Sequence, residues 1–184
     1  MFLIGAVLIG LVLGYLRGGR VAHLAQLRLR SLWLVGIALA IQLAIFPLFR
    51  ADPLLPYATS FFHLLSYGLA LVFLVLNYRA FPFLGIGLGA LLNLLTITVN
   101  GGYMPSSPAA LIRAGHYSVA ARLLEEGVYG NVILMSGETQ LNFLGDILFL
   151  PRWIPLSTAF SIGDLVLALS LIWLVAWGMG LDSE

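Results

Sequence analysis

The sequence contains no cysteine and few charged residues. Without cysteine the chain has no disulfide, no thiolate metal site, no iron–sulfur cluster and no cysteine nucleophile. Charged residues make up 9% of the chain, whereas a soluble domain carries about 25%. Hydrophobic residues reach 61%, so too few polar side chains remain to cover a surface in water. We therefore expect a lipid bilayer to be the principal partner of the chain.

Several sequence motifs of enzymes and binding modules are also absent. The chain has no Walker lysine, no His-Glu-x-x-His and no Gly-x-Ser-x-Gly. Its formal net charge of +1 gives no indication of nucleic-acid binding. Its three histidines, His23, His63 and His116, are scattered along the chain. The sequence therefore predicts no catalytic residue and no metal site, and it leaves any cofactor unknown.

Long apolar segments predict transmembrane helices. A helix that crosses the hydrocarbon needs about 20 residues, or about 17 at the short end. Five segments approach or reach this length and predict an all-α, polytopic membrane helix bundle that forms a single domain, residues 1–184. The expected spans are residues 1–16, 32–49, 57–78, 83–99 and 160–178.

Residues 100–159 predict a folded helical cap, because this segment is rich in leucine and aromatic residues. Ser107 followed by Pro108 is typical of a helix start, and this helix should end at Gly115. A second helix is expected from Ser118 to Glu126. A third is expected over residues 137–150, where about ten apolar residues are too few to span a membrane. This third helix could lie at the interface, re-enter the membrane, or form a tilted sixth span.

The distribution of arginine predicts the orientation. The loop after the first span carries Arg17, Arg20, Arg28 and Arg30, and Arg79 lies in a later tight turn. Loops rich in arginine stay in the cytoplasm. The N-terminus is therefore expected outside, the C-terminus in the cytoplasm, and the cap on the outer face.

Polar residues in the predicted helices follow helical spacing and predict an inward-facing cavity. In the fourth span a polar stripe includes Asn93 and Asn100, and in the third span it includes His63. In the third cap helix Glu138, Asn142 and Asp146 recur every four residues. Polar side chains are costly in lipid and usually face protein or water. The candidate ligand-binding residues are His63, Asn93, Asn100, Glu138, Asn142 and Asp146.

Structural explanations compete with a binding role for the same residues. Asn93 could simply hydrogen-bond across helices. Asp164 fits a capping box with Ser161. Asp146 could pair with an arginine, and His63 could be a buried hydrogen-bonding residue. The small residues expected to pack helices together are Gly10, Gly14, Gly85 and Gly89.

Three short motifs resemble those of an uncharacterised family of small bacterial polytopic membrane proteins, a domain of unknown function. The motifs are Asn100-Gly101-Gly102-Tyr103-Met104-Pro105, Leu144-Gly145-Asp146-Ile147 and Ser161-Ile162-Gly163-Asp164. The resemblance covers most of the chain. It implies the bacterial cytoplasmic membrane and no activity that can be named. The Asn100-Gly101-Gly102 turn itself predicts either a helix C-cap or a backbone cradle for a ligand.

Three classes of function remain open at this point. The first is a membrane-embedded binding or transport protein that holds a small polar solute or cation in an outer-half cavity. The second is an accessory subunit that contacts other membrane protein subunits. The third is an intramembrane enzyme that uses Asp146 and Glu138 as acid–base carboxylates, with His63 as a metal ligand.

Overall fold

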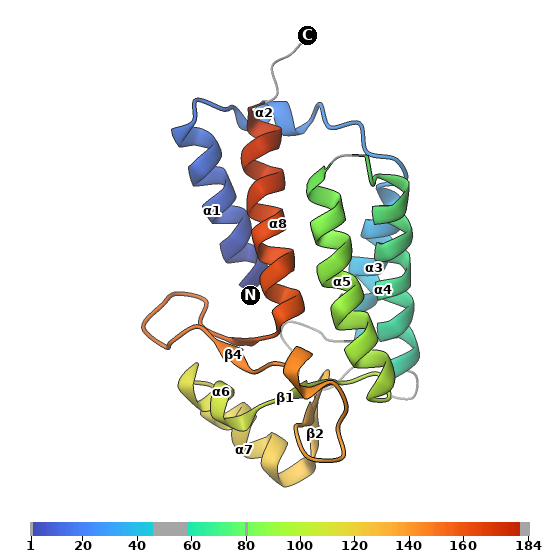
Figure 1. Ribbon diagram of the computed structural model, residues 1–184, viewed down its shortest axis with the longest axis vertical. Coiled ribbons are helices and arrows are strands. Elements are labelled where there is room, and N and C mark those ends of the chain that lie inside the picture. Colours follow the sequence, from blue (N-terminus) through green and yellow to red (C-terminus); the bar gives the residue numbers. More distant parts are fainter. Residues whose placement is uncertain (1, 46–58, 80, 181–184) are drawn as a thin grey trace.

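The computed structural model describes residues 2–45, 59–79 and 81–180. Within these residues the long helices form a bundle with a mixed α/β cap at one end, and successive long helices run in opposite directions (Figure 1). The short helix α2 (Val21–Leu24) follows α1 and lies at the end of the bundle opposite the cap (Figure 1). The bundle helices are α1 (Phe2–Leu16), α3 (Trp33–Ile45), α4 (Thr59–Leu76), α5 (Phe81–Val99) and α8 (Ile162–Met179).

Three of the described helices are long and apolar enough to cross a membrane: Thr59–Leu76, Pro82–Val99 and Ile162–Met179. The helices α1 and α3 are apolar but shorter, with 15 and 13 described residues. The predicted end of the second span, residues 46–49, and the predicted start of the third, residues 57–58, lie outside the described residues.

The helix α8 lies between α1 and α5, and glycines bring the three backbones close together (Figure 1). A Cβ on Gly10 would lie 2.8 Å from the Cβ of Val175, and a Cβ on Gly14 would contact Met179. On the opposite side of α8, a Cβ on Gly85 would contact Ser170. A Cβ on Gly89 would lie 2.6 Å from the carbonyl oxygen of Gly163. These glycines therefore permit helix contacts that any larger residue would obstruct.

Of the remaining bundle helices, α4 packs beside α5, and α3 packs against α4 (Figure 1). Their apolar contacts include an edge-to-face pair between Phe73 and Phe83, with ring centroids 5.8 Å apart. A polar contact joins α3 to α4, because the Gln42 amide donates to the Ser66 hydroxyl at 2.6 Å. A cross-helix hydrogen bond of this kind satisfies polar groups that lipid would leave unpaired.

The first half of the cap contains the two predicted short helices. The Ser107 side chain accepts a hydrogen bond from Ala110 N at the start of α6 (Pro108–Arg113). The next helix, α7 (Tyr117–Glu126), ends at Gly127, whose φ of 74° is left-handed. Both predictions are confirmed, with boundaries that differ by one or two residues. Leu111, Ala120 and Leu123 form the small apolar core beneath these helices.

The second half of the cap differs from its prediction, because residues 137–150 do not form a helix. This segment contains one 3-10 turn, η2 (Asn142–Leu144), and the strand β4 (Leu148–Phe149), which pairs with β5 (Ala159–Phe160). A three-stranded sheet lies beside it, in the order β1 (Met104–Ser106), β3 (Val132–Leu134) and β2 (Val128–Tyr129). The all-α prediction is therefore wrong for the cap.

Residues 137–150 do not form a helix because local polar side chains bond to the backbone and because one residue has a left-handed conformation. The Asn142 amide donates to Ser136 O at 2.8 Å, and the Thr139 hydroxyl donates to the Asn142 side chain at 2.7 Å. Such local hydrogen bonds compete with a helix for the backbone. Leu141 has a φ of 53°, which a right-handed helix does not allow. The four-residue spacing of Glu138, Asn142 and Asp146 therefore does not place them on one helix face.

Candidate functional site

A cavity of about 500 Å³ lies where the cap meets the first turns of α1 and α8. Phe2 stacks on Phe160 at a centroid distance of 4.3 Å and joins α1 to the cap beside this cavity. The lining is apolar on the side of α1 and more polar on the side of the cap. Its polar members are Ser106, Tyr129, Asn131, Asp146, Thr158 and Asp164.

Asp146 is held in the cavity wall by its own backbone. Its N–H donates to Pro105 O at 2.8 Å, and its carbonyl accepts from Ser107 N at 3.1 Å. These bonds form an isolated parallel bridge between Asp146 and Ser106. Within the described residues, the Asp146 carboxyl group has neither a hydrogen bond nor an ion pair to any side chain.

The electrostatic environment of Asp146 favours its protonated form. Burial away from water, assisted by the negative charge of Asp164, raises the pKa of Asp146 from 3.8 to about 8. At neutral pH the carboxyl group is therefore mostly protonated. A positive charge placed beside it would reverse this preference, because an opposite charge stabilises the ionised form.

The hydroxyl group of Ser106 is a second unsatisfied group in the same wall. Ser106 is fully buried, and its Oγ has no hydrogen-bond partner among the described residues. A buried polar group without a partner typically costs about 1–3 kcal/mol. Ser106 and Asp146 are bridged neighbours that line one cavity, but the Ser106 hydroxyl has no exposed surface, so the Asp146 carboxyl is the group in this wall that a bound solute can reach.

Asp164 lines the cavity too, but its carboxylate already has partners. Its Oδ1 accepts from the Asn93 amide at 2.8 Å, and its Oδ2 accepts from Ser161 N at 3.1 Å. The Ser161 hydroxyl accepts from Asp164 N at 2.9 Å and donates to Asn93 Oδ1 at 2.8 Å. The predicted capping box is confirmed. Asn93 is buried in this network and joins α5 to the start of α8, so it does not line the cavity.

His63 and Asn100 hold the turn that follows α5. The ring Nδ1 of buried His63 donates to Gly102 O at 2.9 Å. Gly102 has a φ of 98°, and a Cβ there would collide with Ser60 on α4. Asn100 donates to Thr96 O at 2.8 Å and to Gln140 O at 2.9 Å, and it accepts from Gln140 N at 2.8 Å. The turn therefore ends α5 and anchors the cap.

Two other predicted residues lie away from the cavity. Glu138 is exposed, and the side chain of Asn142 is occupied within its own loop. Of the six predicted residues, Asp146 is the one that lines this cavity. Glu138 and Asp146 do not share a cavity as an acid–base pair would. No group of three or more potential metal ligands occurs among the described residues.

The arginines of the cap do not neutralise Asp146 in the described part of the chain. The guanidinium of Arg113 lies 5.4 Å from the ring centroid of Phe149, and that of Arg122 lies 5.3 Å from the ring centroid of Tyr129. The backbone and Cβ of Arg152 pack near Gly115. Pairing with an arginine was the structural explanation for Asp146, and none of these three arginines pairs with its carboxyl group.

The comparison with known proteins agrees with the sequence resemblance. The family described as "Family of unknown function (DUF5317)" matches residues 26–176. The chain belongs to the DUF5317 family. No curated protein and no solved structure matches it. The DUF5317 match includes Ser106, Asp146 and Asp164, and it leaves out α1, which supplies the apolar wall of the cavity.

Sequence reasoning on this DUF5317 protein missed most of the cavity. Ser106 stands between Pro105 and Ser107 in a three-residue strand, where no periodicity marks it. The spacing of Ser161 and Asp164 marks Asp164 as a capping residue and gives no sign of the cavity. The signal that the sequence offers is Asp146, an acidic residue in an apolar segment, and the structure places it in the lining of this cavity.

Proposed function

We propose that this protein is a multi-pass membrane protein that binds a small cationic solute in the cavity beneath its cap. The observation that carries the proposal is the Asp146 carboxyl, which lines the cavity without a side-chain partner among the described residues. A cation beside Asp146 would ionise the carboxyl group and bind to it. The volume of about 500 Å³ is within the usual range of small-molecule sites.

Five membrane spans are supported by the directions of α1, α3, α4, α5 and α8, which alternate along the chain (Figure 1). A 15-residue helix such as α1 is about 22 Å long, which is shorter than the hydrocarbon thickness of about 30 Å. Arg17 directly after α1 can reach the interface with its long side chain. A short α1 is therefore compatible with a span.

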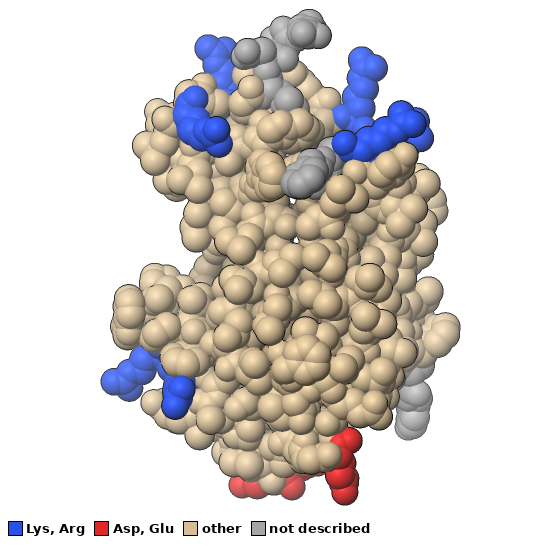
Figure 2. Space-filling model, in the orientation of Figure 1, with Lys and Arg blue, Asp and Glu red and all other residues tan. Residues whose placement is uncertain are grey.

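The charges support an orientation with the cap outside, in a bacterial cytoplasmic membrane. Figure 2 shows arginines gathered over the end of the molecule where α2 lies, and acidic residues at the cap end together with other arginines. The arginines near α2 are those of the first loop and Arg79. Arginine-rich loops remain cytoplasmic, so the N-terminus would be outside and the C-terminus inside.

Reporter fusions test this orientation. Green fluorescent protein fused after Glu184 is expected to fluoresce, and alkaline phosphatase at the same position is expected to be inactive. Alkaline phosphatase inserted at Gly130, an exposed turn of the cap, is expected to be active. An active phosphatase after Glu184 would contradict the orientation.

Binding of methylammonium to the detergent-purified protein tests the proposed site, with neutral acetamide as a probe of similar size. Methylammonium affinity, measured by calorimetry, is expected to rise about tenfold per pH unit between pH 5 and 7. The reason is that the cation must displace the proton of Asp146, whose pKa is about 8. Asp146→Asn is expected to abolish this binding.

The matched control is Glu138→Gln, which removes an exposed carboxylate from the same segment of the cap. This variant should bind methylammonium like the wild type. Binding that is unchanged in Asp146→Asn, or that weakens as the pH rises, would refute the proposal. Acetamide binding of equal strength would show a neutral-solute site instead and would likewise refute a cation site.

A further inference from the structure

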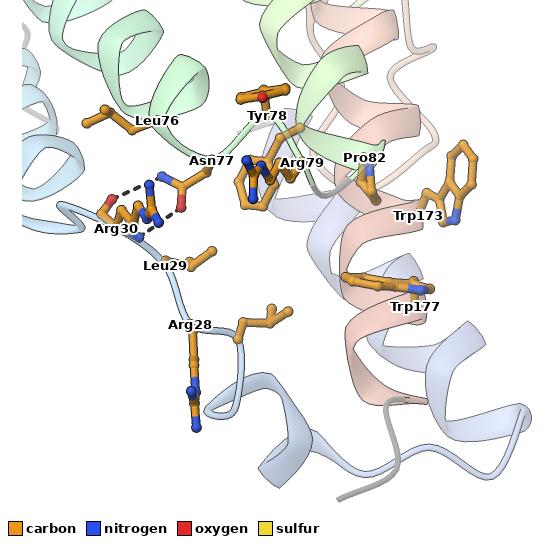
Figure 3. Close-up of a pocket in the computed structure, with 12 residues that line it drawn as sticks. Arg28, Leu29, Arg30, Leu76, Asn77, Tyr78, Arg79, Pro82, Trp173 and Trp177 are labelled. Carbon is orange, nitrogen blue, oxygen red and sulfur yellow. Dashed lines mark hydrogen bonds between the residues drawn. The ribbon is translucent and has the colours of Figure 1, made fainter. Parts of the chain in front are cut away.

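A second cavity, of about 660 Å³, lies at the end of the bundle opposite the cap (Figure 3). It is formed by the loop after α2, the turn between α4 and α5, and the last turns of α8. Arginines, aromatic rings and aliphatic side chains all contribute to its lining. Its basic, amide and indole side chains are those of Arg28, Arg30, Asn77, Arg79, Trp173 and Trp177.

The charged residues that line this second cavity are all basic. Arg28, Arg30 and Arg79 line it, and no acidic residue is among its described lining residues. All three arginine residues are exposed, so their guanidinium groups remain available to a ligand. A planar guanidinium donates two parallel hydrogen bonds to a phosphate or a carboxylate. The ligand that this charge favours is therefore an anion.

Asn77 fixes the position of one of these arginines. Its carboxamide oxygen accepts from Arg30 N at 2.8 Å, and its amide donates to Arg30 O at 3.0 Å and to Phe73 O at 2.8 Å. Asn77 is buried, so the loop is held to the end of α4 by specific bonds. Figure 3 shows Arg30 and Arg79 on either side of Asn77, while Arg28 extends away from them.

The rest of the lining suits a ligand with an apolar part. Trp173 and Trp177 of α8 line this cavity, and both are exposed although they are large and apolar (Figure 3). Tryptophan and tyrosine concentrate at the membrane–water interface, and Tyr78 lines the same cavity. Basic pockets between membrane helices on the cytoplasmic side bind the phosphate groups of lipids.

We propose that this second cavity binds a phosphate-bearing anion, with Arg30 and Arg79 as its principal ligands and the tryptophans beside its apolar part. An anionic phospholipid such as phosphatidylglycerol and free inorganic phosphate share this chemistry. The proposal does not depend on the cap cavity, since the two lie at opposite ends of the bundle and have no lining residue in common.

Lipid-dependent thermal unfolding of the full-length protein in dodecyl maltoside tests the proposal. Phosphatidylglycerol is expected to raise the unfolding temperature, and phosphatidylcholine is expected to leave it unchanged. The double variant Arg30→Gln/Arg79→Gln is expected to lower the apparent affinity for phosphatidylglycerol roughly thirtyfold. This figure takes about 1 kcal/mol for each arginine near a membrane surface, converted to an equilibrium constant.

The matched control is Arg17→Gln/Arg20→Gln, which removes the same charge from the same end of the molecule but outside the cavity. This control should retain the affinity for phosphatidylglycerol. A shift produced equally well by inorganic phosphate would support the same site with free phosphate as its ligand. Equal stabilisation by phosphatidylglycerol and phosphatidylcholine, or an equal loss of affinity in both double variants, would overturn the proposal.

Tryptophan fluorescence provides a measurement that needs no arginine variant. In a Trp33→Phe/Trp153→Phe background, both replaced residues being exposed, only the two tryptophans of the second cavity remain. Brominated phosphatidylglycerol at a low fraction in phosphatidylcholine vesicles should quench them more strongly than brominated phosphatidylcholine at the same fraction. Equal quenching by the two brominated lipids would overturn the proposal.

Discussion

Gly89→Ala is expected to destabilise the helix bundle by about 1–3 kcal/mol, the usual cost of inserting a methyl group into a close contact. The new Cβ would lie 2.6 Å from Gly163 O and 2.8 Å from Leu167 N. Both atoms belong to the backbone of α8, so neither can rotate away, and the two helices must separate. Unfolding of the purified variant by sodium dodecyl sulfate, followed by circular dichroism, measures the loss.

The matched control is Gly87→Ala, two residues earlier on the same helix. Among the described residues, a Cβ at position 87 would have no atom of another helix within 4 Å. Alanine favours a helix over glycine by about 1 kcal/mol, so this variant should be neutral or slightly more stable. Equal stability of the two variants would show that α5 and α8 do not approach as closely as the structure places them.

The stability of the wild-type protein is expected to fall as the pH rises from about 5 to about 8, while that of Asp146→Asn stays flat. The folded protein binds the proton of Asp146 more tightly than the unfolded chain, because its pKa is about 8 in the folded state and near 3.8 otherwise. At pH values between these two pKa values, the free energy of unfolding falls as the pH rises, by up to about 1.4 kcal/mol per pH unit.

Thermal unfolding at pH 5, 6, 7 and 8, without any added cation, measures this slope. Glu138→Gln should keep the pH dependence of the wild type, since Glu138 is exposed. At pH 8 the Asp146→Asn variant is expected to be the more stable protein, because it removes the cost of ionising a buried carboxyl group. A wild-type stability that does not change over this range would place Asp146 in contact with water.

The local signals in the sequence predicted the helix ends well. Ser107 with Pro108, Gly127, and Ser161 with Asp164 each act within one helical turn, and the structure places a helix boundary at each of them. The spacing of Gly85 and Gly89 placed both residues on one face of α5, where they contact α8. Apolar length and helical spacing are properties of neighbouring residues, so they can be read before the chain folds.

The cap and its cavity could not be predicted in the same way. Ser106 and Asp146 are bridged although 40 positions separate them, and the strands β1 and β3 pair in parallel although 28 positions separate their partners. Backbone hydrogen bonds between segments that are far apart in the sequence do not require a repeating pattern of side chains, and a strand of three residues is too short to show one. The four-residue spacing of Glu138, Asn142 and Asp146 suggested a helix face, but the local hydrogen bonds of Asn142 prevented it.

By itself, the sequence determined that the chain is apolar, that it forms a bundle of long helices, and where several of those helices begin and end. Only the tertiary structure decided which polar residues meet. It paired Asn93 with Asp164, gave His63 and Asn100 structural roles, and left Asp146 unpaired in a cavity. The reason is physical: a hydrogen bond across helices or strands depends on how separate elements are placed, and spacing along the chain carries no information about that placement.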